Sequence, residues 1–107
     1  MEKYITCIEE LNKLKAEQNF SFIYFKNDKC TVCDSLLPQL KIKLTEWNQK
    51  VYIVDCFEYP DIAAQNLVLS VPALKVFYAG QELINMIRFV DLSKLEVDFN
   101  RIKSMLG

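Results

Sequence analysis

The feature that most restricts the fold is a short apolar segment followed by two closely spaced cysteines and a long amphipathic helix. Residues 20–25 read Phe-Ser-Phe-Ile-Tyr-Phe between polar flanks, and a run of this length is typical of a strand buried on both faces. After a polar loop come Cys30 and Cys33, and apolar residues then recur at helical spacing from residue 36 to residue 47. The pattern predicts two thiols at the N-terminus of a helix that directly follows a buried strand.

The rest of the chain alternates between helical and strand patterns. A helix is expected up to about residue 18 behind a Thr6-x-x-Glu9 capping box, and a C-terminal helix behind Asp91 as its N-cap. Further strands are expected at 51–56, 73–78 and 83–89, with a short helix at 61–68. The first β-α-β unit predicts a parallel pair with a right-handed crossover, and the last two strands an antiparallel hairpin. The fold class is therefore α/β, with a central mixed four-stranded sheet flanked by helices on both faces, in one domain of residues 1–107.

The composition excludes several kinds of chemistry. The chain has 107 residues, no histidine, two glycines and a formal net charge of −1. It therefore lacks Ser-His-Asp and Cys-His catalysis, histidine metal sites and glycine-rich phosphate loops. We expect no cofactor and no metal, no nucleic-acid or membrane partner, and a monomer. The N-terminal segment has no apolar run of the length a signal peptide or membrane span needs, so a cytoplasmic location is expected.

The spacing of Cys30 and Cys33 suits disulfide exchange. Two thiols three residues apart can close a small ring, and a thiol at a helix N-terminus meets unpaired N–H groups and the positive end of the helix dipole. Both effects favour thiolate over thiol. Cys30 is therefore predicted to attack a substrate disulfide, and Cys33, one turn further in, to resolve the mixed disulfide.

Two other interpretations of the cysteines stay open at this stage. A C-x-x-C pair can be half of a four-cysteine zinc site, but Cys7 and Cys56 are isolated singletons and not a second pair. Free cysteine is among the most buried residue types, so Cys7 and Cys56 are expected to pack in the interior. Pro72, similarly, can be an ordinary proline at the start of a strand.

The chain resembles the thioredoxin family from about Thr6 to Leu106. Three features carry the resemblance: Cys30-Thr31-Val32-Cys33 at the start of a helix, Pro38 five residues later, and the stretch from Ser70-Val71-Pro72 to Ala79-Gly80. The resemblance implies a thioredoxin-like fold whose extra N-terminal strand is short or missing. It also implies that Pro72 is cis, that the Val71 backbone pairs with an extended substrate segment, and that Cys30 and Cys33 are catalytic. The implied partners are protein disulfide substrates and an unidentified dithiol reductant or reductase.

Several residues depart from the family pattern. Tyr24 replaces a buried acid that serves proton transfer, Lys26 and Lys29 replace aromatic residues, and Arg88 replaces a glycine near the substrate surface. These departures favour an alternative function, a thioredoxin-fold protein-binding module with weak or no redox turnover. The charges of Lys26, Lys29 and their acidic neighbours are otherwise expected to form a solvated loop.

Overall fold

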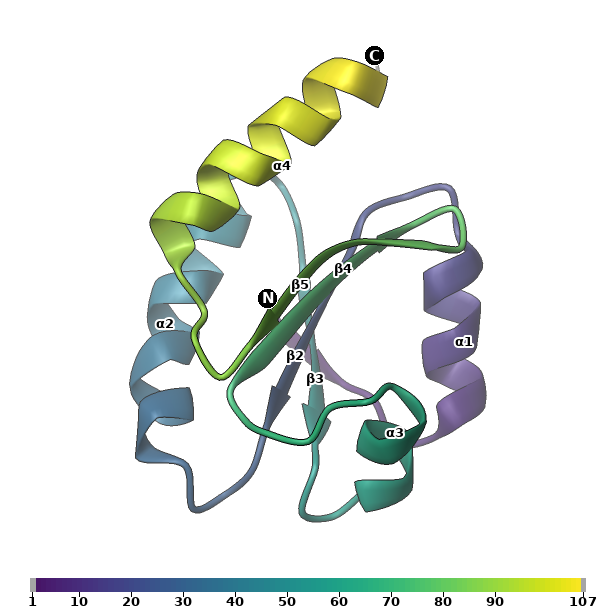
Figure 1. The fold of residues 1–107 in the computed structure, drawn as a ribbon, viewed down its shortest axis with the longest axis vertical. Coiled ribbons are helices and arrows are strands. Elements are labelled where there is room, and N and C mark those ends of the chain that lie inside the picture. The colour runs from purple at the N-terminus through teal and green to yellow at the C-terminus, as the bar shows by residue number, and fades with distance from the viewer. Residues whose placement is uncertain (1, 107) are drawn as a thin grey trace.

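The structure, a computed structural model, describes residues 2–106, which form five strands and four helices (Figure 1). In chain order the elements are β1 (Glu2–Tyr4), α1 (Ile8–Ala16), β2 (Ser21–Lys26), α2 (Thr31–Glu46), β3 (Val51–Asp55), α3 (Pro60–Gln65), β4 (Ala73–Tyr78), β5 (Gln81–Ile87) and α4 (Leu92–Leu106). This is the predicted order with one additional strand at the start. None of the helices between residues 2 and 106 is long and apolar enough to cross a membrane.

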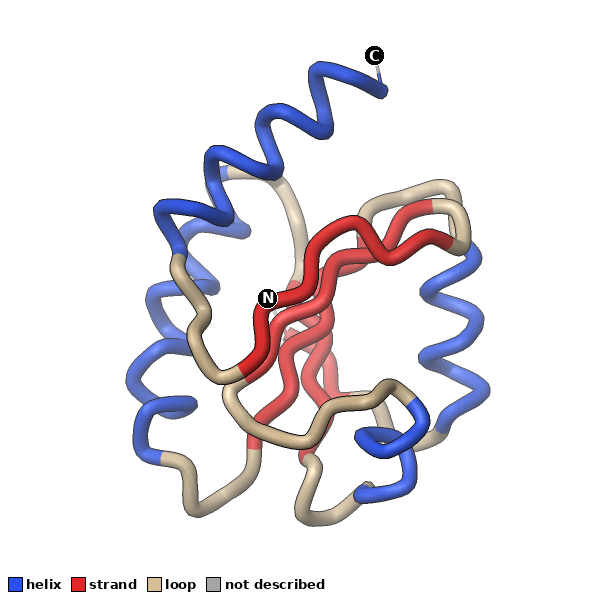
Figure 2. The backbone as a smooth tube through the Cα atoms, in the orientation of Figure 1, coloured by secondary structure: helices blue, strands red, loops and turns tan. Residues whose placement is uncertain are grey.

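The strands form one mixed sheet in the order β1-β3-β2-β4-β5 (Figure 2). β3 runs parallel to both β1 and β2, whereas β4 is antiparallel to β2 and to β5. Helices α2 and α4 cover one face of the sheet, and α1 and α3 cover the other (Figure 1). The predicted fold class, with a mixed sheet between two helical layers, is confirmed.

The sheet has five strands and not the expected four, and the fifth is the extra N-terminal strand that the family resemblance implied would be short or missing. β1 is only three residues long and all three are exposed, so its sequence shows no alternation. The strand is defined by its backbone pairing with β3, from Glu2 opposite Val51 to Tyr4 opposite Ile53. Directly after it, Ile5 is fully buried and its N–H donates to the Ile53 carbonyl at 2.8 Å.

β2 lies in the middle of the sheet and contributes side chains to two hydrophobic cores. Phe22 and Tyr24 belong to the core beneath α2 and α4, and Ile23 and Phe25 to the core beneath α1 and α3. All four side chains are fully buried, because successive residues of a strand point to opposite faces. The buried strand that the sequence predicts is therefore confirmed, and it holds the segment that precedes the cysteines.

The expected start of α1 was wrong. Helix α1 has Cys7 as its N-cap, without a side-chain hydrogen bond, so the predicted capping box of Thr6 and Glu9 does not form. Instead the Thr6 N–H donates to the Glu10 carboxylate at 3.3 Å. At this cap position Cys7 is exposed, whereas burial was expected.

The start of α4 agrees with the sequence. One Asp91 carboxylate oxygen accepts the N–H groups of Ser93 and Lys94 at 3.0 and 3.1 Å, which is the N-cap arrangement that the sequence predicts.

An aromatic cluster joins both helices of one face to β2. The Phe99 ring of α4 lies 4.8 Å from the Trp47 ring, 4.9 Å from that of Phe20 and 5.2 Å from that of Phe22. Because Phe99 is fully buried, its ring fills the space between α4, the end of α2 and the sheet.

Phe99→Ala should lower the free energy of unfolding by about 3–5 kcal/mol, because it leaves a cavity among these rings. Urea unfolding followed by circular dichroism measures the change. Val97→Ala, also on α4 but 59% exposed, is the matched control and should stay within about 0.5 kcal/mol of the parent protein. A loss below about 1 kcal/mol for Phe99→Ala would contradict this packing.

Candidate active site

The two cysteines lie where β2 passes into α2. Cys30 is the N-cap of α2, and its Sγ accepts the N–H of Cys33 at 3.1 Å. The two residues are joined by a disulfide, with their Cα atoms 5.2 Å apart. Cys33 is fully buried, whereas Cys30 is half-buried at the edge of the same core. A half-buried outer cysteine and a fully buried inner cysteine differ in their access to a substrate.

The Cys30 sulfur takes the position that a serine or aspartate oxygen has in an ordinary helix cap. An N-cap acceptor satisfies one of the unpaired N–H groups of the first turn and lies at the positive end of the helix dipole. When the disulfide is reduced, the same N–H of Cys33 can donate to a Cys30 thiolate. The geometry therefore favours the charged, nucleophilic form of the outer cysteine.

A turn built by Asn27 sets up this cap. The Asn27 side-chain oxygen accepts the N–H of Lys29 at 3.0 Å, and its carbonyl accepts the N–H of Cys30 at 3.3 Å. The sequence analysis missed this structural role of Asn27, although an asparagine just before a helix commonly indicates a turn.

Tyr24 connects β2 to the buried cysteine. Its hydroxyl donates to the Cys33 carbonyl at 2.8 Å, and its ring is fully buried. Burial, and secondly the negative charge of Asp34, raise the pKa of Tyr24 to about 12. The hydroxyl is therefore a neutral donor at physiological pH, and it does not replace the acid of the family pattern as a proton acceptor.

The residues predicted to bind substrate lie at the same end of the sheet as the cysteines. The Val71–Pro72 peptide bond is cis, and the next residue, Ala73, begins β4 opposite Phe25 of β2. Val71 is half-buried and contacts both cores. The Pro72 carbonyl accepts the N–H of Arg88 at 2.7 Å, which ties this segment to the end of β5.

A hollow of about 390 Å³ lies beside the cysteines. It is lined by Val32 and Leu36 of α2, by Pro72 and by residues 88–91. Because Val32 lies between the two cysteines in sequence, the hollow borders the C-x-x-C motif itself.

Arg88 adopts a backbone conformation that is uncommon for arginine. Its φ is +70°, in the left-handed region that costs an L-residue roughly 1–2 kcal/mol and costs glycine little. The strand expected over residues 83–89 was therefore wrong at its end, because β5 spans Gln81–Ile87. A positive φ stops β5 at Ile87 and leaves Phe89 79% exposed on the rim of the hollow.

The other two cysteines are not part of this site. Cys56 follows β3 and is half-buried; burial, and secondly Asp55, raise its pKa to about 11. Its predicted packing is thus partly confirmed, whereas Cys7 is exposed at the start of α1. Within residues 2–106 no cluster of three or more cysteine, aspartate or glutamate side chains could hold a metal ion. The geometry gives no support to a four-cysteine zinc site.

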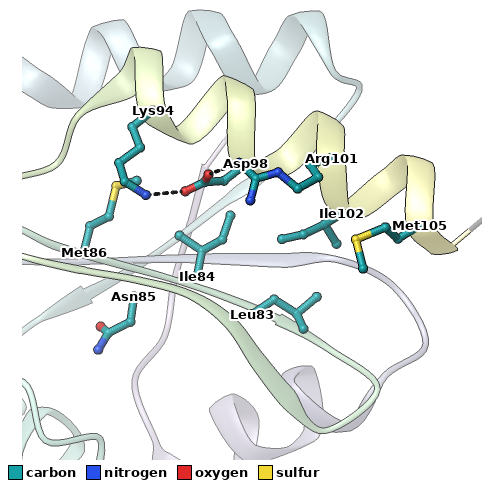
Figure 3. Close-up of a pocket in the computed structure, with 9 residues that line it drawn as sticks. All are labelled: Leu83, Ile84, Asn85, Met86, Lys94, Asp98, Arg101, Ile102 and Met105. Atoms are coloured by element: carbon teal, nitrogen blue, oxygen red, sulfur yellow. Dashed lines mark hydrogen bonds and ion pairs between the residues drawn. The ribbon is translucent and has the colours of Figure 1, made fainter.

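A second hollow lies between β5 and α4 (Figure 3). Apolar side chains of both elements line it. The Asp98 carboxylate at its rim pairs with Lys94 at 2.7 Å and with Arg101 at 3.6 Å. These charges satisfy one another, so this groove lacks the reactive groups that the first hollow has beside it.

Comparison with known proteins identifies the family. The sequence matches the family model described as Thioredoxin over residues 8–101. The chain belongs to the thioredoxin family. It is 36% identical over 87 residues to the thioredoxin-like protein YdfQ of Bacillus subtilis strain 168, a match that covers 80% of this chain and 78% of that protein. At the level of the family, the chain is a thiol-disulfide oxidoreductase with a C-x-x-C pair.

Solved thioredoxins share the fold. Thioredoxin 1 of Thermosipho africanus superposes with a TM-score of 0.74 and 28% identity, over 79% of this chain and 96% of that one. Thioredoxin of Trypanosoma brucei brucei superposes with a TM-score of 0.84 at 19% identity, over 97% of this chain and 92% of that one. At 19% identity, the similarity to the Trypanosoma brucei brucei protein shows a shared fold and no more.

The raised pKa of Tyr24 makes stability depend on pH in a defined direction. The unfolded tyrosine ionises near pH 10, whereas the folded one resists ionisation up to about pH 12. Its contribution is therefore complete below pH 10 and is lost as the pH rises from 10 to 12. At pH 11 the loss is about 1.4 kcal/mol. Tyr24→Phe should lack this loss, although it starts about 0.5–1.5 kcal/mol less stable at pH 7 without the hydrogen bond to Cys33.

The measurement is the free energy of unfolding of both proteins at pH 7 and pH 11. Tyr52→Phe, which removes a half-buried hydroxyl that makes no hydrogen bond within residues 2–106, should keep the pH dependence of the parent protein. Equal pH dependence in Tyr24→Phe and the parent protein would contradict the role given to burial.

The two free thiols should differ in reactivity. At pH 8 a thiol with a pKa of about 11 is about 0.1% thiolate, so Cys56 should react about a hundredfold more slowly than an ordinary free thiol. Exposed Cys7 should be alkylated first when oxidised protein is treated with iodoacetamide, as followed by peptide mapping. In urea both should react at similar rates, and similar rates in the folded protein would show that Cys56 is not protected.

Proposed function

We propose that this protein reduces disulfides in other proteins through Cys30 and Cys33. The observation that carries the proposal is the position of the Cys30 sulfur as the cap of α2, with the Cys33 N–H directed at it from 3.1 Å. This arrangement supports a nucleophilic outer thiolate and a buried second thiol that can reach it. Cys30 is proposed as the attacking residue and Cys33 as the resolving residue.

The exchange runs in two balanced steps. The Cys30 thiolate attacks one sulfur of the substrate disulfide; the substrate S–S bond breaks, and the second substrate sulfur leaves as a thiolate that takes up a proton. Cys33 then loses its proton and attacks the Cys30 sulfur, which releases the first substrate sulfur as a thiol. Two electrons and two protons pass to the substrate, and the Cys30–Cys33 disulfide remains. A dithiol reductant or a reductase must return the pair to the reduced state.

Val71 is proposed to hold the substrate next to Cys30. Neither its N–H nor its C=O makes a hydrogen bond within residues 2–106, and both belong to the segment that leads into β4. Free backbone groups beside a sheet can pair with an extended peptide, as in β-strand addition. Pro72 is buried except where it lines the neighbouring hollow, and it would contact that peptide there.

We further propose that the protein acts in the cytoplasm as a monomer. A reducing compartment keeps thiols such as Cys7 and Cys56 free. The near-neutral net charge of −1 favours protein substrates over nucleic acid.

A second candidate is a protein-binding module with weak redox turnover. Tyr24 favours it, because a neutral hydroxyl at the Cys33 carbonyl supplies no base to take the Cys33 proton. In this case the mixed disulfide would form but resolve slowly.

The test is reduction of insulin disulfides with dithiothreitol as the dithiol donor. The protein should accelerate the reaction beyond dithiothreitol alone, and Cys30→Ser and Cys33→Ser should both abolish the acceleration. When reduced Cys33→Ser is desalted and mixed with insulin without dithiothreitol, it should accumulate a mixed disulfide with the substrate, since the resolving thiol is gone.

The control is the double variant Cys7→Ser/Cys56→Ser, which should keep full activity. Activity in Cys30→Ser would disprove the proposal, and reversible oxidation without turnover in the parent protein would favour the binding module. The reduction potential of the Cys30–Cys33 pair shows whether the protein reduces or oxidises its substrates. A value near about −270 mV fits a reductant, and one near about −120 mV fits an oxidant.

A further inference from the structure

Arg88 holds a position where a side chain is costly and glycine is easily accommodated. Its φ of +70° follows directly on β5, and its N–H donates to the Pro72 carbonyl at 2.7 Å. This hydrogen bond needs only the backbone, so a glycine would make it equally well and without strain. The arginine side chain has no part in holding the turn together.

The guanidinium of Arg88 has no partner in the fold. It makes no ion pair and no hydrogen bond with any other residue from 2 to 106, and the residue is exposed. The acid nearest in sequence, Asp91, caps α4 through the N–H groups of Ser93 and Lys94. An unpaired cation therefore lines the hollow beside the cysteines.

The hollow combines that cation with apolar walls and with Asp91, whose carboxylate already accepts two N–H groups of α4. Val32, Leu36 and Phe89 contribute hydrophobic surface, and Val32 and Phe89 are 59% and 79% exposed. A guanidinium binds a carboxylate with two parallel hydrogen bonds, and it is more weakly hydrated than an ammonium group. The hollow therefore suits a segment that presents an acidic side chain next to an apolar one.

We propose that Arg88 selects disulfide substrates that carry an acidic residue next to the cysteine attacked by Cys30. The substrate strand runs past Val71 and Pro72, and Arg88 pairs with the carboxylate of the flanking residue in the hollow. This proposal rests on the proposed function, because it assigns a substrate class to the same site.

The test uses two synthetic peptides with one intramolecular disulfide, identical except for glutamate or lysine beside the first cysteine. Protein reduced with dithiothreitol and then desalted is mixed with each peptide, and the single-turnover rate of peptide reduction is measured at low salt. The glutamate peptide should react about two- to fivefold faster, which is the range of a solvent-exposed ion pair. The preference should shrink as salt is added, because the pair is screened.

Variants at residue 88 distinguish the effect of the side-chain charge from the effect of the strained backbone. Arg88→Gln should remove the preference, Arg88→Glu should reverse it, and Arg88→Lys should keep most of it. Arg88→Gly relieves the backbone strain and should also lose the preference while gaining stability. Lys13→Gln, on the exposed face of α1, changes the net charge by the same amount as Arg88→Gln and should behave like the parent protein.

The outcomes distinguish the two proposals. Equal rates for the two peptides in the parent protein, or an unchanged preference in Arg88→Gln, would overturn the role of Arg88 and leave the reductase intact. Failure to reduce either peptide would overturn the proposed function, and the substrate class with it.

Discussion

The site depends on the way Cys33 is held between two hydrogen bonds. Its N–H donates to the sulfur of Cys30, and its carbonyl accepts the hydroxyl of Tyr24 at 2.8 Å. The first bond directs the helix N-terminus at the outer sulfur, and the second ties the first turn of α2 to β2. Because the side chains of β2 are buried in two cores, the cysteine pair follows a strand that is packed on both faces. A substrate therefore meets a sulfur whose position is set before it binds.

Some polar groups on the surface around the cysteines lack a hydrogen-bond or ion-pair partner within residues 2–106. The backbone groups of Val71 have no partner within residues 2–106, and the same holds for the guanidinium of Arg88. Within residues 2–106 every buried side-chain nitrogen and oxygen atom has a hydrogen-bond partner, in contrast to these groups at the cysteine end of the sheet. A bound peptide would satisfy both the backbone and the charge, which links the proposed reduction to the proposed choice of substrate.

Much of this arrangement could be predicted from the sequence, because local patterns encode it. The apolar run of β2, the C-x-x-C spacing and the Asp91 cap each need only a few neighbouring residues, and the structure agrees with all three. Features that depend on contacts between residues far apart in the sequence were harder to predict. β1 is identified by its pairing with β3 and not by its own three residues. The positive φ of Arg88 accompanies a hydrogen bond to Pro72, sixteen residues earlier in the sequence. The residues next to Arg88 do not predict this backbone conformation. Cys7 was expected in the interior because free cysteine usually is buried, but it is the exposed N-cap of α1.

The most direct test asks which thiol of the reduced protein is the nucleophile. Fully reduced protein is treated with a limiting amount of iodoacetamide at neutral pH, and the labelled cysteine is located by peptide mapping. Cys30 should carry most of the label, because its sulfur caps α2 and the residue is only half-buried, whereas Cys33 is fully buried. Preferential labelling of Cys33 would contradict the assignment of attack to Cys30 and resolution to Cys33.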